Sequence, residues 1–271
     1  MWTSEILIAT AAVGALAGFL AGLFGVGGGT LVVPAVLWLL EKQGTGGAYG
    51  QHLAVGTSFA VMVFTTFSGA LAQHRRRAVR WDVVLRMSPA MIAGGAAGAL
   101  VSRWLPMRFL QWFFMLMVTA VAVQLLLRLK PKPGRELPGR AGLAGVGGAI
   151  GVVSSWVGIG GGSLSVPFLV YCNVPVHQAI GTSGGLAWTI AVSGAAGYLL
   201  AGLGTPGLPP YSLGFWYLPA AAALAVCTTL FAPLGVRTAH RLPPEKLKTA
   251  LGLLMLAIAA QMAWKMFRAA G

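Results

Sequence analysis

The chain has 271 residues, of which 57% are hydrophobic and only 9% are charged, and its mean hydropathy is +0.79. Soluble domains carry about 25% charged residues, so this composition excludes a water-soluble protein. Apolar stretches of about 20 residues recur along the chain and predict a polytopic α-helical membrane protein. The net charge is +14, but the basic residues gather between the apolar stretches, as in cytoplasmic loops, which disfavours a nucleic-acid surface.

The apolar stretches predict a series of helical segments. In chain order they are 4–24, 29–40, 53–73, 82–102, 107–129, 141–157, 162–172, 176–202, 213–236 and 246–267. The segments 29–40 and 162–172 are much shorter than the others, and too short to cross about 30 Å of hydrocarbon. Each follows a glycine-rich stretch, so the pattern predicts a half-helix or re-entrant piece at both places.

Two halves of the chain share the same motifs in the same order. GVGGGTLVVP at 25–34 is matched by GIGGGSLSVP at 158–167, and HLAVGTS at 52–58 by HQAIGTS at 177–183. Further along, Ser-Gly-Ala at 68–70 recurs at 193–195. The repeat predicts three parts, which are a first transmembrane repeat at 1–130, a basic cytoplasmic linker at 131–140 and a second transmembrane repeat at 141–271.

The distribution of lysine and arginine predicts the direction of each half. Fourteen of these residues lie in the loops 74–86, 128–140 and 237–248, whereas the loop 203–213 has none. Basic loops face the cytoplasm, so the matched helices 53–73 and 176–202 cross the membrane in opposite directions. The expected fold is all-α, a transmembrane bundle of two inverted-topology repeats, each with a glycine-broken re-entrant hairpin. Such repeats are typical of secondary transporters. The expected location is the bacterial inner membrane, with both termini outside.

The glycine breaks predict a site for a small anion at the midplane. A helix that begins at such a break points free N–H groups and its positive dipole end at the tip. The five acidic residues all fall at segment ends or in loops, whereas a cation path would normally bury a carboxylate. The predicted substrate-binding residues are Gly27, Gly28, Gly29, Thr30, Gly160, Gly161, Gly162, Ser163, Thr57, Ser58, Thr182, Ser183, His52 and His177.

Other glycines and the two repeated histidines allow simpler interpretations. Small residues spaced by four predict helix-packing faces at Gly14, Gly18 and Gly22, at Gly94 and Gly98, and at Gly147 and Gly151. The histidines of the repeated motif could relay protons or contact the anion, or could be local residues at a helix start near the interface.

The paired motifs also carry a resemblance. GLFGVGGGTLVVP with HLAVGTS, and SSWVGIGGGSLSVP with HQAIGTSGG, resemble the sulfite exporter TauE/SafE family of membrane permeases over almost the whole chain. The resemblance implies transport of a small organosulfur compound or sulfur oxyanion, such as sulfite or a sulfonate, usually outward. The function expected is therefore a secondary transporter and not an enzyme, working by alternating access.

Two alternatives remain open at this level. The first is an anion channel, because inverted repeats also occur in passive pores. The second is a rhomboid-like intramembrane serine protease, because Gly-Thr-Ser-Gly at 181–184 follows His177. The two cysteines have no metal-binding spacing, and neither a metal nor a cofactor is expected. The expected partners are the small anion and the lipid bilayer, with a homodimer left open and no nucleic acid.

Overall fold

The computed structural model describes residues 4–24, 27–127, 134, 136–239, 241 and 244–268, and most of them are helical. The elements in chain order are α1 (Ser4–Phe24), α2 (Gly29–Lys42), the 3₁₀ helix η1 (Gly47–Tyr49), α3 (Gly50–Arg75), α4 (Trp81–Ser102), α5 (Met107–Leu126), α6 (Arg140–Val157), α7 (Gly162–Tyr171), α8 (Val176–Gly202), β1 (Ser212–Leu213), β2 (Trp216–Tyr217), α9 (Leu218–Ala239) and α10 (Pro244–Arg268).

The predicted helical segments are confirmed within three residues at every boundary but one. The predicted start at 213 is wrong, because α9 begins only at Leu218. The preceding residues form a small antiparallel hairpin in which Ser212 pairs with Tyr217 and Leu213 with Trp216. Gly214, at φ +54°, supplies the turn conformation that a two-residue hairpin requires.

Five of the described helices are long and apolar enough to cross a membrane. They are α3 together with η1, α4, α5, α8 and α9. Burial separates central helices from peripheral ones. In α3 and in α8, 72% of the apolar 18-residue stretch is buried, against 28% in α5. Large apolar side chains such as Leu85, Leu116 and Leu230 are more than half exposed on the outer helices. Such a surface suits contact with lipid.

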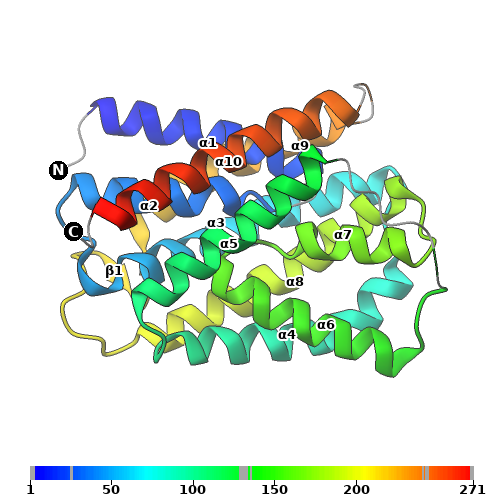
Figure 1. The fold of residues 1–271 in the computed structure, drawn as a ribbon, viewed down its shortest axis with the longest axis horizontal. Coiled ribbons are helices and arrows are strands. Elements are labelled where there is room, and N and C mark those ends of the chain that lie inside the picture. The colour runs from blue at the N-terminus through cyan, green and yellow to red at the C-terminus, as the bar shows by residue number, and fades with distance from the viewer. Residues whose placement is uncertain are drawn as a thin grey trace.

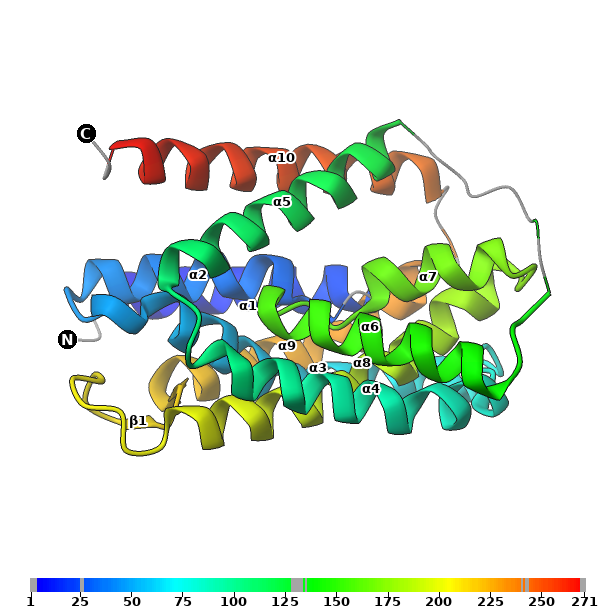
Figure 2. The same ribbon diagram turned by 60° about the horizontal axis from the view of Figure 1, so that its bottom comes forward.

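The helices pack in pairs that recur between the two halves. α3 packs on α8 at the centre, α1 lies along α9, and α6 lies along α4. α3 also contacts α9, just as α8 contacts α4, and the short helices α2 and α7 pack on α3 and α8 respectively. α5 and α10 pack on each other and form a separate layer (Figure 2).

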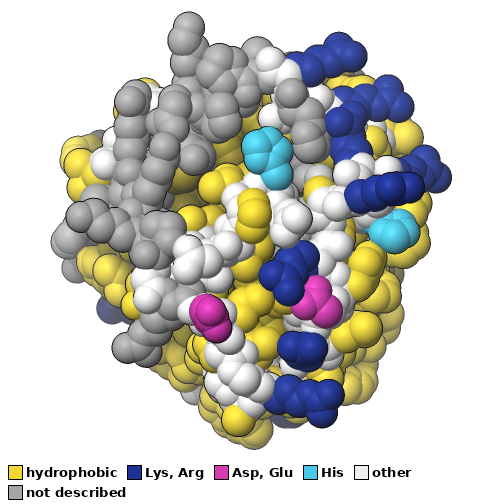
Figure 3. Space-filling model, turned by 90° about the vertical axis from the view of Figure 1, so that its right-hand side faces the viewer, with side chains coloured by type: hydrophobic (Ala, Val, Ile, Leu, Met, Phe, Trp, Pro, Cys, Tyr) yellow, Lys and Arg dark blue, Asp and Glu magenta, His cyan; other side chains and the backbone are white. Residues whose placement is uncertain are grey.

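The two ends of the bundle differ in charge. We call the end where α3 stops and α4 begins the basic end; it carries Arg75, Arg76, Arg77, Arg80, Arg140, Arg237 and Arg241. Figure 3 shows lysine and arginine side chains gathered on this face. α6 begins and α7 ends there, whereas α1 begins and α2 ends at the other end of the bundle, which we call the opposite end (Figure 1).

The predicted glycine packing faces are confirmed as sites of close backbone approach. A Cβ added at Gly18 would overlap the main chain of Thr228 on α9, and one at Gly22 would overlap the Ala232 carbonyl. The same relation holds between the other pair of helices, where a Cβ on Gly94 of α4 would overlap the Gly148 carbonyl of α6. Glycine is therefore required on these faces because main chain meets main chain.

Candidate functional site

Each half of the chain breaks its first helix at glycines with left-handed backbone. Gly27 and Gly28 lie at φ +83° and +80° before α2, and Gly158 and Gly161 lie at φ +73° and +67° on either side of the break before α7. Residues with a Cβ rarely adopt this conformation, so glycine is required here by the backbone itself. Residues 25–26, which belong to the first break, lie outside the described residues.

The two breaks contact each other in the interior of the bundle. A Cβ added at Gly29 would overlap the Gly158 carbonyl, and one at Gly27 would lie 3.2 Å from the Cα of Gly160. Residues 27–30 and 158–162 are all buried. The structure thus brings together the predicted glycines of both halves, at a point where two helices begin.

The helices that begin at the breaks present their N-termini to this point. Gly28 and Gly161 are the N-cap residues of α2 and α7, and neither helix has a side-chain hydrogen bond at its cap. The first N–H groups of a helix have no partner within the helix and carry partial positive charge. Next to these glycines lie Thr30, which is buried, and Ser163, which is half-buried. Two partly positive helix ends therefore start at the contact between the breaks.

The serines of the repeated GTS motif differ in their hydrogen bonds. The Ser58 hydroxyl donates to the carbonyl oxygen of Gly158 at 3.2 Å, so it holds the break of the other half. The Ser183 hydroxyl donates to Ile180 of its own helix at 2.8 Å, as serines in membrane helices commonly do. Of the two, Ser58 belongs to the contact between the breaks.

The threonines of the motif join the halves elsewhere. Thr57 Oγ1 accepts a hydrogen bond from the N–H of Tyr217 at 2.9 Å, and Thr182 Oγ1 accepts one from the N–H of Arg80 at 3.0 Å. Tyr217 and Arg80 are the residues directly before α9 and α4. Each threonine therefore anchors the start of a helix in the other half, and its hydroxyl acts there and not at the breaks.

Thr57→Val should lower the melting temperature more than Thr182→Val. Valine keeps the shape of threonine but leaves the N–H of Tyr217 without a partner, and an unpaired buried donor costs about 1–3 kcal/mol. The bond of Thr182 is only partly buried, so water can replace it. Thermal unfolding in detergent measures the difference. Thr238→Val, at a half-buried threonine whose hydrogen bond within its own helix is exposed, is the control, and an unchanged melting temperature for Thr57→Val would contradict the anchoring role.

The two predicted histidines lie at different ends of the bundle, one at each, and cannot share one site. His52 is buried, and its Nε2 donates to the Ser102 carbonyl at 2.9 Å while its ring packs on Tyr49 and Phe215. It borders a hollow of about 750 Å³ at the opposite end, with Arg103 and Arg108. His177 is exposed at the start of α8, by the basic end. Neither histidine is among the residues at the contact between the breaks.

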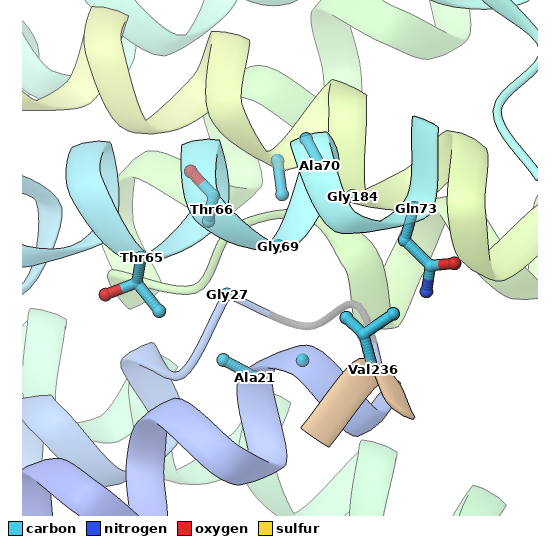
Figure 4. Close-up of a pocket in the computed structure, with 11 residues that line it drawn as sticks. Ala21, Gly27, Thr65, Thr66, Gly69, Ala70, Gln73, Gly184 and Val236 are labelled. Carbon is cyan, nitrogen blue, oxygen red and sulfur yellow. The ribbon is translucent and has the colours of Figure 1, made fainter. Parts of the chain in front are cut away.

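A small cavity of about 20 Å³ lies beside the first break (Figure 4). That is room for about one water molecule. Its lining residues are Ala21, Gly22, Gly27, Thr65, Thr66, Gly69, Ala70, Gln73, Gly184, Ala187 and Val236. The polar residues of this lining all come from α3, and the sequence analysis did not select them.

The polar cavity residues differ in how they are bonded. The hydroxyl of Thr66 donates to Met62 of its own helix at 2.6 Å, and that of Thr65 contacts the Thr228 hydroxyl of α9 at 2.5 Å. The Gln73 side chain is buried, and its Oε1 finds no hydrogen-bond partner among the described residues. The signal that could have found them is a series of polar residues inside an otherwise apolar helix.

Known proteins with related sequences are membrane transporters by name. The chain is 34% identical over 253 residues to a "Probable membrane transporter protein" of Haemophilus influenzae, covering 92% of this chain and 95% of that protein. It is 25% identical to the "Probable membrane transporter protein MJ0441" of Methanocaldococcus jannaschii, covering 90% of each. A "Probable membrane transporter protein" of Xylella fastidiosa is 26% identical over 271 residues, covering 97% of each. No solved structure matches the chain.

A family model decides the assignment. The model described as "Sulfite exporter TauE/SafE" matches residues 10–262, which include both glycine breaks, both GTS motifs and the cavity beside the first break. The expected resemblance is therefore confirmed over nearly the whole chain. The protein is a multi-pass membrane transporter that belongs to the sulfite exporter TauE/SafE family.

Proposed function

We propose that the protein exports a small sulfur-containing anion, such as sulfite or an organosulfonate, as a secondary transporter with alternating access around the two glycine breaks. The observation that carries this proposal is the contact between the breaks. One break comes from each half, they meet in the buried interior, and a helix N-terminus begins at each. Discontinuous helices that point their N-termini at a shared site are a known way to bind an anionic substrate within a membrane.

The alternating-access part rests on a proposed inverted repeat. The pairing of α1 with α9 recurs as that of α6 with α4, and Thr57 and Thr182 anchor equivalent helix starts. α1 begins and α2 ends at the opposite end, whereas α6 begins and α7 ends at the basic end (Figures 1 and 2). These relations support two hairpins of opposite orientation, which can rock about a common site.

The charge of the substrate is argued from the distribution of acids and dipoles. The acidic side chains that the structure describes, Glu41, Asp82 and Glu136, are all exposed, and Asp82 pairs with Arg80 at 2.7 Å. No acidic group among them faces the contact between the breaks. Two positive helix ends without a neighbouring carboxylate favour an anion over a cation.

The direction is proposed from the sign of the membrane potential, which acts on an anion whichever way the protein is oriented. If the basic end faces the cytoplasm of a bacterial inner membrane, both termini lie outside. A cell interior at negative potential drives an anion outward, by about 2.3 kcal/mol per charge per 100 mV. Export thus requires no coupling ion.

The two alternative functions are less well supported. A channel needs a continuous path, whereas here the breaks are in close contact and the cavity beside them holds about 20 Å³. A serine protease needs a hydroxyl presented to a base, whereas the Ser183 hydroxyl donates its hydrogen bond to the carbonyl oxygen of Ile180. A carrier that must rearrange to pass its substrate fits these contacts better than either.

Thermal unfolding of the purified protein with a panel of anions tests the proposal. Sulfite or a sulfonate is expected to raise the melting temperature, since a ligand at 100 times its Kd adds about 2.7 kcal/mol of stability. Sulfate and taurine, which is itself a sulfonate, complete the panel of sulfur compounds, and chloride is the comparison without sulfur. Ser58→Ala, at the contact between the breaks, is expected to reduce the shift, and Ser183→Ala is the matched control that should keep it. The absence of a shift with every sulfur anion would overturn the substrate class.

A further inference from the structure

The central helices α3 and α8 can be compared residue by residue. Their shared motifs place every residue of α3 125 positions before its equivalent on α8, as in His52 and His177 or Gly69 and Gly194. Both helices lie at the centre of the bundle and pack on each other. If equivalent residues were alike, the free space beside the breaks would be similar on both sides. The free space differs between the two sides, and the difference arises at a few positions.

On the side of the basic end, the space beside the breaks is open. A Cβ added at Gly69 would meet no other atom within 4 Å, and one at Gly184 would have Ala70 as its nearest neighbour, at 4.0 Å. Gln73 lies one helical turn further along α3 and lines the same cavity. In Figure 4 the side chains of Thr65 and Gln73 point from α3 toward the helices that carry Ala21 and Val236.

On the side of the opposite end, the equivalent space is filled. The ring of Phe59 covers Gly194, since a Cβ there would lie 2.8 Å from the ring. Tyr198, the equivalent of Gln73, packs its ring 5.9 Å from that of Phe59 and donates its hydroxyl to the Ser155 carbonyl at 3.0 Å. The ring of Phe215 follows 6.3 Å beyond. All three aromatic side chains are fully buried.

Each residue of this aromatic cluster has a small or polar equivalent at the basic end. Phe59 corresponds to Gly184 and Tyr198 to Gln73. Phe215 corresponds to Ala78, because the motif glycines Gly56 and Gly181 pack on the carbonyls of Phe215 and Ala78. The symmetry between the two halves is therefore broken at these positions. Three large rings lie on the side of the opposite end, and a glycine, an amide and a methyl group lie on the side of the basic end.

The chemistry of Gln73 suits a ligand in the open cavity. Its amide has two donors and one acceptor, and a half-turn of the terminal group exchanges them. The amide can thus donate to an oxyanion or accept from a protonated one. An unpartnered buried amide oxygen is costly unless a ligand or water satisfies it. Tyr198, in contrast, already donates its hydroxyl within the protein.

We propose that the transported anion is bound on one side of the breaks only, by Gln73 in the cavity toward the basic end once that cavity widens beyond the room for one water molecule that it has here, and that Phe59, Tyr198 and Phe215 form the barrier that closes the path to the opposite end. The choice of an anion rests on the proposed function, whereas the one-sided barrier does not. Transport then requires this barrier to open while the cavity at Gln73 closes.

Labelling of single cysteines tests the barrier. In a chain with Cys172→Ala and Cys227→Ala, Gly69→Cys places a single thiol in the open space, where a Cβ meets no other atom within 4 Å. The reagent is the membrane-impermeant anion sulfonatoethyl methanethiosulfonate, added to vesicles of either orientation. Tyr211→Cys, at an exposed position of the loop before β1, and Arg76→Cys, at the basic end, report which side is exposed to the reagent.

Gly69→Cys is expected to react at least about ten times faster from the basic end than from the opposite end. Phe59→Ala, or the milder Phe59→Leu, should open a path from the opposite end, so that Gly69→Cys then also reacts from that end. Equal labelling of Gly69→Cys from both ends would overturn the barrier. So would labelling of Gly69→Cys from the opposite end that Phe59→Ala leaves unchanged.

Protection of Gly69→Cys by sulfite or a sulfonate tests the role of Gln73. Gln73→Leu is expected to weaken protection about tenfold, which corresponds to one hydrogen bond to a charged group, and Gln73→Glu to abolish it. The melting temperature of Gln73→Leu without ligand should hardly change, which separates binding from folding in that variant. Protection that is unaffected by both variants would overturn the role of Gln73. One-sided labelling that no sulfur anion slows would support the barrier and contradict the substrate of the proposed function.

Discussion

Gly29→Ala is expected to abolish transport, because the added methyl group would occupy the position of the Gly158 carbonyl. No side chain can rotate away to make room, since the clash is with main chain of the other break. Overpacking of this kind costs about 1–3 kcal/mol or more, which lowers the melting temperature by about 2–4 °C per kcal/mol in a chain of this size. Transport in proteoliposomes should fall to background even at temperatures where the variant remains folded.

Gly145→Ala is the matched control for this prediction. Gly145 lies on the exposed side of α6, and a Cβ there would meet no other atom within 4 Å. Alanine favours a helix by about 1 kcal/mol over glycine, so this variant should keep its transport and its stability. Should Gly29→Ala transport as well as Gly145→Ala, the contact between the breaks would have no part in the mechanism.

Gly22→Leu is expected to prevent α1 from packing on α9 and so to remove most of the folded protein. The Cβ alone would overlap the Ala232 carbonyl, and the rest of the leucine side chain would force the helices further apart. Because α1 lies along α9, separating them exposes the adjoining faces of both, and we expect a loss of about 3 kcal/mol or more. The yield of monodisperse protein and its melting temperature measure the effect.

Ala12→Leu provides the comparison on the same helix. Ala12 is exposed on α1, so a leucine there meets the surroundings of the bundle and not α9. Yield and melting temperature should match those of the unchanged protein. A Gly22→Leu protein as stable as Ala12→Leu would mean that the close approach of α1 to α9 is not needed for folding.

The helices and their packing faces could be predicted from local properties of the chain. A helix in lipid must satisfy its own backbone and present apolar side chains, so each segment is visible as a run of consecutive residues. The boundary before α9 escaped because the strands of its hairpin are as apolar as a helix end. The faces at Gly18 and Gly94 were visible because the spacing by four places small residues on one side of a helix.

The candidate site was only partly predictable. Only glycine readily adopts the positive φ that these breaks require, so both breaks could be predicted from the glycine-rich stretches of the sequence. Thr57 and Thr182 were predicted to act with the breaks because the GTS motif that contains them also recurs in both halves, yet their hydroxyls anchor the starts of α9 and α4. Gln73 was overlooked because it has no equivalent of its own kind, since Tyr198 occupies that position in the second half.

The sequence by itself determined the class of protein, the helices, the two breaks and the family, because hydrophobicity, glycine conformation and motif order reside in neighbouring residues. Only the tertiary structure decided which groups meet. Ser58 reaches Gly158 across 100 residues, and Thr57 reaches Tyr217 across 160. It also decided that Phe59 fills one side of the breaks while Gly184 leaves the other open. Whether space is filled depends on side chains that several distant helices bring together, and no local pattern records that sum.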